Sequence, residues 1–223
     1  MNLKNLLCCY VFGVLAVQYQ HTLAAQVTVS VEDNEGHLIE NAVVTAIPLN
    51  VNSFPKPKPK VKKEIVDQID KEFFPFVKVV QVNTWVNFPN NDDIRHHVYS
   101  FSSAKRFELP LYSGTHAEPV LLDSSGVVVL GCNIHDWMIG YIYISETPYF
   151  EKTVSNHQTV FKDLPGGEYI MKVWHSNMLV SEESTSKRIK LDAIDNINIE
   201  WRLTLKPEFK IPRQWIPARS SLY

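Results

Sequence analysis

The sequence lacks an excess of charge of either sign, and this narrows the classes of partner. Its 223 residues include 22 lysines and arginines and 24 aspartates and glutamates, for a formal net charge of −2. Proteins that bind nucleic acid usually carry a basic surface, and many that bind membrane surfaces carry a cluster of lysine and arginine. We therefore expect neither a nucleic-acid partner nor a polybasic membrane contact.

Long hydrophobic runs are also missing. The main apolar stretch, residues 6–17, is shorter than the ~20 residues that span a bilayer. It follows Lys4 and precedes Ala24 and Ala25, an order of charge, apolar run and small residues that is typical of a secretory signal. Residues 1–25 therefore predict an exported, periplasmic protein, with cleavage near Ala24 or Ala25 and no membrane span after removal of the signal.

Cysteine is scarce, and its positions matter. The chain has 3 cysteines, of which Cys8 and Cys9 would leave with the signal, so the mature protein would keep Cys132 alone. A single cysteine excludes a disulfide within one mature chain, and a free thiol is a liability in an oxidising compartment unless it is buried or bound. Cys132 is then either a buried apolar residue or a thiolate with a chemical role.

Helical periodicity longer than a turn or two is absent, which favours an all-β fold. Short runs rich in β-branched and aromatic residues alternate with turns rich in Asn, Asp, Ser, Pro and Gly. Residues 26–50 predict a two-strand hairpin, in which the alternating Val27, Val29 and Val31 form one apolar face. Residues 54–60 alternate proline and lysine and predict a semi-rigid linker in extended polyproline conformation.

Two further strand-rich stretches follow the linker. The first predicts about eight short strands, typical of an antiparallel sandwich. They lie at residues 63–68, 76–82, 85–88, 97–101, 107–111, 120–122, 127–132 and 139–144. The second predicts strands at 159–161, at 169–174 and from 197, where apolar and polar residues alternate. The tail, residues 207–223, contains three spaced prolines that argue against regular structure.

Residues 131–140 carry the strongest chemical pattern. They read Gly-Cys-Asn-Ile-His-Asp-Trp-Met-Ile-Gly and follow an apolar strand directly. Cys132, His135 and Met138 are each separated by two residues, so a tight loop can turn a thiolate, an imidazole and a thioether towards one ion. One Cys and two His, with a weakly bound axial Met, form a ligand set that suits copper cycling between Cu(I) and Cu(II). The loop therefore predicts three of four copper ligands.

The second histidine of such a site must come from another strand. His96 and His97 both open the strand predicted after residues 90–95. Because neighbours on a strand point to opposite faces, only one of them can face the loop. We take His96 as the ligand and His97 as a residue behind the site or at the surface. The predicted ligands of one copper ion are therefore His96, Cys132, His135 and Met138.

Other chemistries fit these residues less well. Structural zinc sites use several Cys or His ligands and no methionine. A Cys–His nucleophile pair for hydrolysis is conceivable, but the adjacent Met138 has no role in it. The remaining histidines of the predicted mature protein are scattered, and we interpret them as structural or surface residues: His37, His116, His157 and His175.

With these residues in place, residues 61–146 resemble a cupredoxin, nearest in its loop to the amicyanin and plastocyanin group. That group has an Asn a few residues before a His that opens a strand, and then Cys, two residues, His, a short gap and Met. The corresponding positions are Asn90, His96, Cys132, His135 and Met138. The chain departs from the group at His97, where an Asn is common. The resemblance implies a Greek-key β-sandwich, one copper ion and single-electron transfer.

The segments on either side of the predicted copper domain resemble a different family of β-sandwiches. Residues 29–36 with 41–44, and residues 161–169, resemble parts of carboxypeptidase regulatory-like or transthyretin-like sandwiches. This resemblance implies that residues 26–53 and 147–206 pair into a second small β-sandwich, into which the copper domain 61–146 is inserted. The same resemblance implies a scaffold or docking role for this second sandwich.

Taken together, the sequence predicts a periplasmic electron carrier that is not itself an enzyme and that meets redox proteins transiently. The exposed edge of His135 is the expected electron port, with Trp137 and Ile139 in a small docking patch, since weak redox encounters bury little surface. Two alternatives stay open: a copper-binding or delivery module, and an adhesion or structural protein without metal. A multicopper oxidase is disfavoured because the chain has no His-x-His pair.

Overall fold

The computed structural model describes residues 25–50, 63–114, 117–192 and 195–207. The predicted signal before Ala25, the Pro/Lys linker, His116 and the tail beyond Pro207 lie outside these residues. Within the described ranges, no helix has the length and apolar character needed to cross a membrane. Apart from one 3-10 turn, η2 (Glu182–Thr185), the regular structure described there consists of strands. The prediction of an all-β fold is confirmed.

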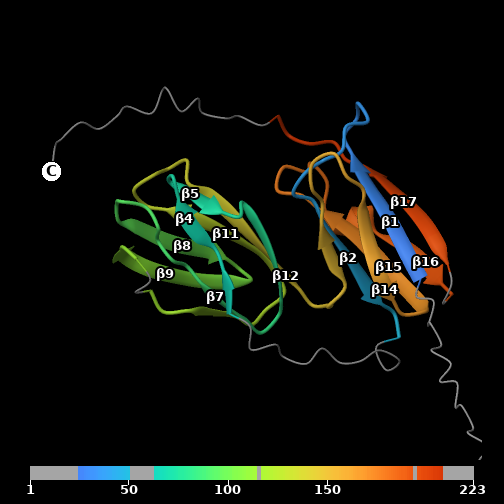
Figure 1. Ribbon diagram of the computed structural model, residues 1–223, viewed down its shortest axis with the longest axis horizontal. Coiled ribbons are helices and arrows are strands. Elements are labelled where there is room, and N and C mark those ends of the chain that lie inside the picture. Colours follow the sequence, from blue (N-terminus) through green and yellow to red (C-terminus); the bar gives the residue numbers. More distant parts are fainter. Residues whose placement is uncertain (1–24, 51–62, 115–116, 193–194, 208–223) are drawn as a thin grey trace, which may run out of the picture.

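The first of two sandwiches consists of residues 63–145 and holds a large and a small sheet (Figure 1). The large sheet has the order β6 (Val77–Gln81), β12 (Ile139–Ser145), β11 (Gly126–Cys132), β8 (His96–Ser102) and β9 (Lys105–Tyr112). The small sheet has the order β10 (Val120–Leu122), β7 (Thr84–Asn87) and β3 (Lys63–Ile65), and a hairpin of β4 (Asp67–Ile69) and β5 (Glu72–Phe74) adjoins it. One apolar core fills the space between the sheets and includes Cys132 and Met138.

The second sandwich combines strands from both ends of the described chain. One sheet has the order β14 (Thr159–Leu164), β1 (Ala25–Glu32) and β17 (Asn196–Arg202), and the other has the order β13 (Phe150–Lys152), β2 (Val43–Pro48), β15 (Gly167–Trp174) and β16 (Lys187–Leu191). Their inner faces share one buried core, in which Trp201 donates its indole N–H to the Thr185 carbonyl at 2.8 Å. The division of the chain into separate domains stays a prediction.

The predicted hairpin at residues 26–50 is wrong. β1 pairs with β14 and β17, whereas β2 pairs with β13 and β15, so the two strands belong to opposite sheets. The turn at Asp33–Gly36 instead leads the chain across the sandwich. Val27, Val29 and Val31 lie in the same buried core as apolar side chains of β2. The apolar inner faces of the two strands are therefore buried in one core, although the strands do not pair.

Most strand pairs are antiparallel, as the sequence predicts, but three are not. The pairs β1–β17, β6–β12 and β3–β7 are parallel. Each joins strands that are separated by other elements of the chain, as parallel pairing requires. Strands β5, β13 and β16 were not expected. The first two have 3 residues each, and the third is largely charged, so their patterns are too short or too polar to predict a strand.

The two sandwiches meet at β6 and β12 (Figure 1). Val77 and Tyr143 from the first form a small buried cluster with Val43 from the second. Lys152 donates from the second sandwich to the Val77 carbonyl at 3.1 Å. β12 is therefore held from outside by the second sandwich, while its first residue, Ile139, directly follows the predicted metal loop.

Candidate metal centre

The metal loop connects two neighbouring strands of the large sheet. β11 ends at Cys132, the chain turns through residues 133–138, and β12 begins at Ile139. β11 also pairs antiparallel with β8, with Cys132 opposite Val98. The start of β8 therefore lies beside the end of β11, which brings His96 to the loop from a strand about 36 residues earlier.

Three of the four predicted ligands come together in the structure. Cys132 Sγ lies 3.7 Å from His96 Nδ1 and 3.8 Å from His135 Nδ1. One donor atom from each residue lies within 4.8 Å of the other two, and this is the one group of three or more His, Cys, Asp or Glu donors found in the described ranges. The three residues are 0%, 3% and 8% exposed in the order His96, Cys132, His135. The three donor residues are therefore close together and almost completely buried.

These distances suit a metal ion. Bonds of about 2.0 Å to nitrogen and about 2.3 Å to sulfur, set at a trigonal angle of about 120°, place nitrogen and sulfur about 3.7 Å apart. The two S···N distances of 3.7 and 3.8 Å agree with that arrangement. One thiolate and two imidazoles are also the donor set that copper prefers in trigonal sites. The residues present therefore fit a copper ion.

Met138 belongs to the same buried cluster of side chains as Cys132 and is 1% exposed. Its backbone N–H donates to the His135 carbonyl at 2.9 Å, so the chain turns tightly between these two residues. A role for the thioether as an axial ligand stays a prediction, and so does the ligand set as a whole.

The environment of Cys132 favours the thiolate. Burial alone raises the pKa of the thiol, but contacts with the His96 ring and with the backbone N–H groups of His97, Ile134 and His135 outweigh burial and lower it. The contact from His97 comes from its main chain. The histidine that departs from the amicyanin and plastocyanin pattern can therefore support the sulfur whatever its side chain is.

His97 points away from the cluster. Its Nε2 lies 2.9 Å from Glu108 Oε1 but without the geometry of a hydrogen bond. Its ring also contacts Tyr99 edge-on, on the outer face of the large sheet. The structure thus places His96 inside and His97 outside, as strand alternation predicts.

Asp92 is a further residue of the site, which no sequence pattern identifies. Its Oδ2 lies 2.6 Å from His96 Nε2, on the side of the ring opposite Cys132. Burial lowers the pKa of His96, but contacts with Cys132 and Asp92 outweigh burial and raise it. The run of Asn and Asp before His96 was visible in the sequence, but nothing in it separates the half-buried Asp92 from the exposed Asp93.

One edge of the cluster approaches the surface. The His135 ring stacks at an angle on the Trp137 ring, with centroids 5.1 Å apart. Trp137 is half-buried, and Ile134 and Ile139 are 45% and 43% exposed. The half-buried Trp137 ring therefore lies against His135, and the exposed Ile134 and Ile139 share this part of the chain with the exposed polar residues Asn133 and Asp136.

The other described histidines do not join the cluster. His37 lies at the surface, 3.2 Å from Asp33. His157 is exposed, and the buried His175 forms part of a turn of the second sandwich with Asn177 and Met178. These positions agree with structural or surface roles.

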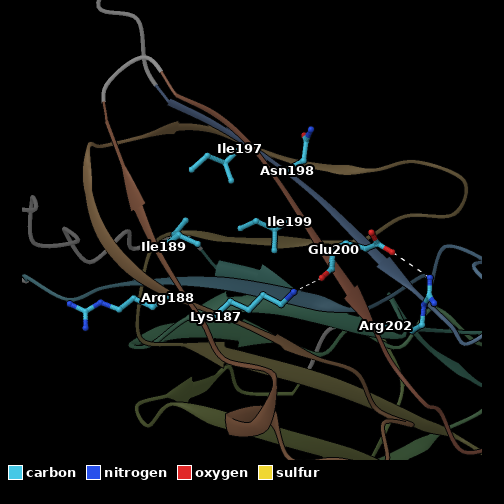
Figure 2. A pocket seen from close by; sticks show the side chains of 8 residues that line it. All are labelled: Lys187, Arg188, Ile189, Ile197, Asn198, Ile199, Glu200 and Arg202. Atoms are coloured by element: carbon cyan, nitrogen blue, oxygen red, sulfur yellow. Dashed lines mark hydrogen bonds and ion pairs between the residues drawn. The ribbon is translucent and has the colours of Figure 1, made fainter.

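A groove of about 740 Å³ lies between the edge strands β16 and β17 of the second sandwich (Figure 2). Its lining combines isoleucines with polar and charged residues: Lys187, Arg188, Ile189, Ile197, Asn198, Ile199, Glu200 and Arg202. Lys187 Nζ donates to the Glu200 carbonyl at 2.6 Å and so covers part of the open edge of β17. None of the lining residues belongs to the His96, Cys132 and His135 cluster, so the groove is separate from the metal centre.

Comparison with known proteins gave partial likenesses only. No family model and no curated protein matches the chain. A copper-containing nitrite reductase (NirK) from Thermus scotoductus SA-01 is 23% identical over 45% of this chain, with a TM-score of 0.37, and the match spans 25% of its own length. A purple cupredoxin from Nitrosopumilus maritimus is 20% identical over 38% of this chain and 100% of its own, with a TM-score of 0.33. A reduced amicyanin variant is 17% identical over 45% of this chain and 99% of its own, with a TM-score of 0.35.

Proposed function

We propose that the protein is an exported blue-copper protein that carries single electrons, with one copper ion held by His96, Cys132, His135 and Met138. The observation that supports this most is the buried Cys–His–His cluster, whose donor atoms lie within 4.8 Å of one another. The chemistry of the donors favours copper over zinc, since a lone thiolate with two imidazoles and a nearby thioether is a soft, trigonal set.

The burial of Cys132 argues against its use as a nucleophile. A nucleophile must touch its substrate, and Cys132 is 3% exposed. His96 is completely buried and is engaged on both ring nitrogens, by Asp92 and by Cys132. Neither residue has the access that a hydrolytic site needs.

A bound copper ion would supply a one-electron couple, and the protein would hold its ligands still. Cys132 terminates β11, which is paired on both sides, with β8 and with β12. His96 begins β8 and is fixed by Asp92. Because these backbone and side-chain contacts set the donor positions independently of the ion, the site would reorganise little when its charge changes.

Electrons would enter and leave at the edge of His135, the most exposed of the three clustered residues. The apolar side chains of Ile134, Trp137 and Ile139 around this edge would form a small contact surface for redox proteins in the periplasm. A contact of this kind buries little area and separates readily.

The proposal is tested by voltammetry on the purified mature protein loaded with Cu(II). We expect a reversible one-electron couple and one copper per chain by metal analysis. A protein that gives up its copper readily to a chelator or to a copper-free acceptor would be a delivery module instead. A protein that retains no copper would contradict both functions.

A further inference from the structure

Both carboxylate oxygens of Asp92 are occupied by contacts from two different parts of the chain. Oδ1 accepts the backbone N–H of Asp70 at 2.6 Å, and Oδ2 accepts that of Lys71 at 2.9 Å. Oδ2 also lies 2.6 Å from His96 Nε2, and the Asp92 side chain is 9% exposed. Asp92 therefore joins the turn between β4 and β5 to a predicted metal ligand.

The turn is built to offer these two N–H groups. Asp70 and Lys71 have φ of 53° and 61°, and they connect two strands through two residues. Hairpin turns with two consecutive left-handed residues match the twist of the strands. Successive N–H groups in a tight turn can form a concave site for an anion, and the Asp92 carboxylate fills that place here.

Asp92 is also fixed from its own loop. Its backbone N–H donates to Asn90 Oδ1 at 3.0 Å. Asn90 is buried, and its amide donates to the carbonyls of Ile94 and Tyr112 at 2.9 Å each. The hairpin is held to the same loop, since Asn91 N–H donates to the Gln68 carbonyl at 3.0 Å. Contacts from the hairpin and from the loop of Asp92 itself therefore hold the carboxylate in one position.

We propose that Asp92 is a positioning residue of the metal centre, and that the Asp70–Lys71 turn holds it in place. The inference rests on the proposed function. A carboxylate only accepts hydrogen bonds, so the facing Nε2 of a neutral His96 must carry the proton, and Nδ1 is left as the electron-pair donor towards Cys132. A carboxylate behind a metal-bound imidazole fixes its orientation and raises its basicity. The remote hairpin would then influence the metal through His96.

The proposal predicts distinct effects for two adjacent acidic residues. Asp92→Asn keeps the shape of the side chain but removes its charge. We expect a higher reduction potential, because a less basic His96 stabilises Cu(II) less, and a fall in copper affinity of about 10–100-fold. Asp93→Asn removes the same charge from an exposed neighbour and is the matched control. Equal shifts in the two variants, or no shift in either, would show that Asp92 has a structural role only.

The turn is tested by two substitutions at one position. Lys71→Gly accepts a positive φ and keeps the N–H, so we expect wild-type potential and affinity. Lys71→Pro can adopt neither the φ of 61° nor the hydrogen bond. It should therefore shift the potential in the same direction as Asp92→Asn. A Pro variant that is folded by circular dichroism and has the wild-type potential would overturn the role of the turn.

A measurement without metal separates this inference from the function itself. In the copper-free protein, at a pH at which the His96 ring is neutral, nitrogen NMR of that ring should show the Nε2–H tautomer, and Asp92→Asn should mix the two tautomers whereas Asp93→Asn should not. A wild-type protein with mixed tautomers would contradict the positioning role. If the tautomer is fixed but no copper binds, the proposed function fails and the positioning of His96 by Asp92 does not.

Discussion

The ring of Tyr99 occupies the space into which a side chain on Gly131 would project. A Cβ added to Gly131 would lie 2.8 Å from Tyr99 Cζ and 2.9 Å from its hydroxyl oxygen. The two residues are cross-strand neighbours of β8 and β11, and Gly131 immediately precedes Cys132. The close approach of this ring therefore leaves little room for a side chain at the strand end from which Cys132 enters the cluster.

Gly131→Ala should destabilise the protein by about 1 kcal/mol, because either the half-buried Tyr99 ring or the end of β11 must move. Denaturant unfolding measures the loss. Tyr99→Leu should restore most of it in the double variant, since the two changes share one contact. Val129→Ala, at an exposed position of the same strand, should cost much less. A Gly131→Ala variant of wild-type stability would show that the ring has room to move.

Substitution of the two adjacent histidines should have different effects on copper binding. His96→Ala removes a buried donor and should abolish copper binding and colour, whereas His97→Ala should retain both. The His97 variant should keep the main-chain contact to Cys132, because the backbone N–H of residue 97 donates it. Absorption and metal analysis of the two variants check this. The reverse result would mean that β8 is displaced by one residue, which exchanges its two faces.

Met138 should tune the couple. Met138→Leu should keep copper and colour but raise the reduction potential, since a soft axial donor that stabilises Cu(II) is lost. Met138→Gln should lower the potential, because a harder oxygen ligand favours Cu(II). Voltammetry gives the sign in each case. Unchanged potentials in both variants would make Met138 a packing residue only, and complete loss of copper in the Leu variant would contradict a weak axial bond.

Stability should depend on pH through Glu182, which accepts a 2.5 Å hydrogen bond from Tyr143 across the junction of the sandwiches. Burial raises the pKa of Glu182 above its ordinary value of 4.5. The folded state therefore holds this proton more tightly than the unfolded state. The corresponding stability is fully present below pH 4.5 and is lost as the pH rises through the folded pKa.

Glu182→Gln should accordingly raise the free energy of unfolding at neutral pH, and the difference from wild type should vanish in acid. Glu183→Gln, at the exposed neighbouring position, serves as the control. Chemical unfolding between acid and neutral pH measures both. A Gln variant that is less stable than wild type at neutral pH would show that the charged carboxylate is the stabilising form.

Local patterns in the sequence were sufficient for most of the strands and for the loop around Cys132. Alternation alone predicted that His96 and His97 face opposite sides, because the backbone of a strand imposes that geometry. The apolar valines of β1 likewise predicted a strand with one buried face. In each case the information lies within a few residues of the feature.

Contacts between distant segments could not be predicted in the same way. The partners of the Asp92 carboxylate are main-chain N–H groups at residues 70 and 71, which carry no sequence pattern of their own. The partner strands of β1 lie more than 100 residues away, at β14 and β17, so a turn at residues 33–36 suggested a hairpin that tertiary pairing overrides. These relationships depend on the three-dimensional fold.

The most direct test of the account is the visible absorption spectrum of the purified mature protein after addition of Cu(II), together with its metal content. The account predicts an intense blue or green colour from charge transfer between the Cys132 thiolate and Cu(II), with one copper per chain. Cys132→Ser should remain folded and lose the colour. A colourless wild-type protein that contains zinc or no metal after loading would contradict the account.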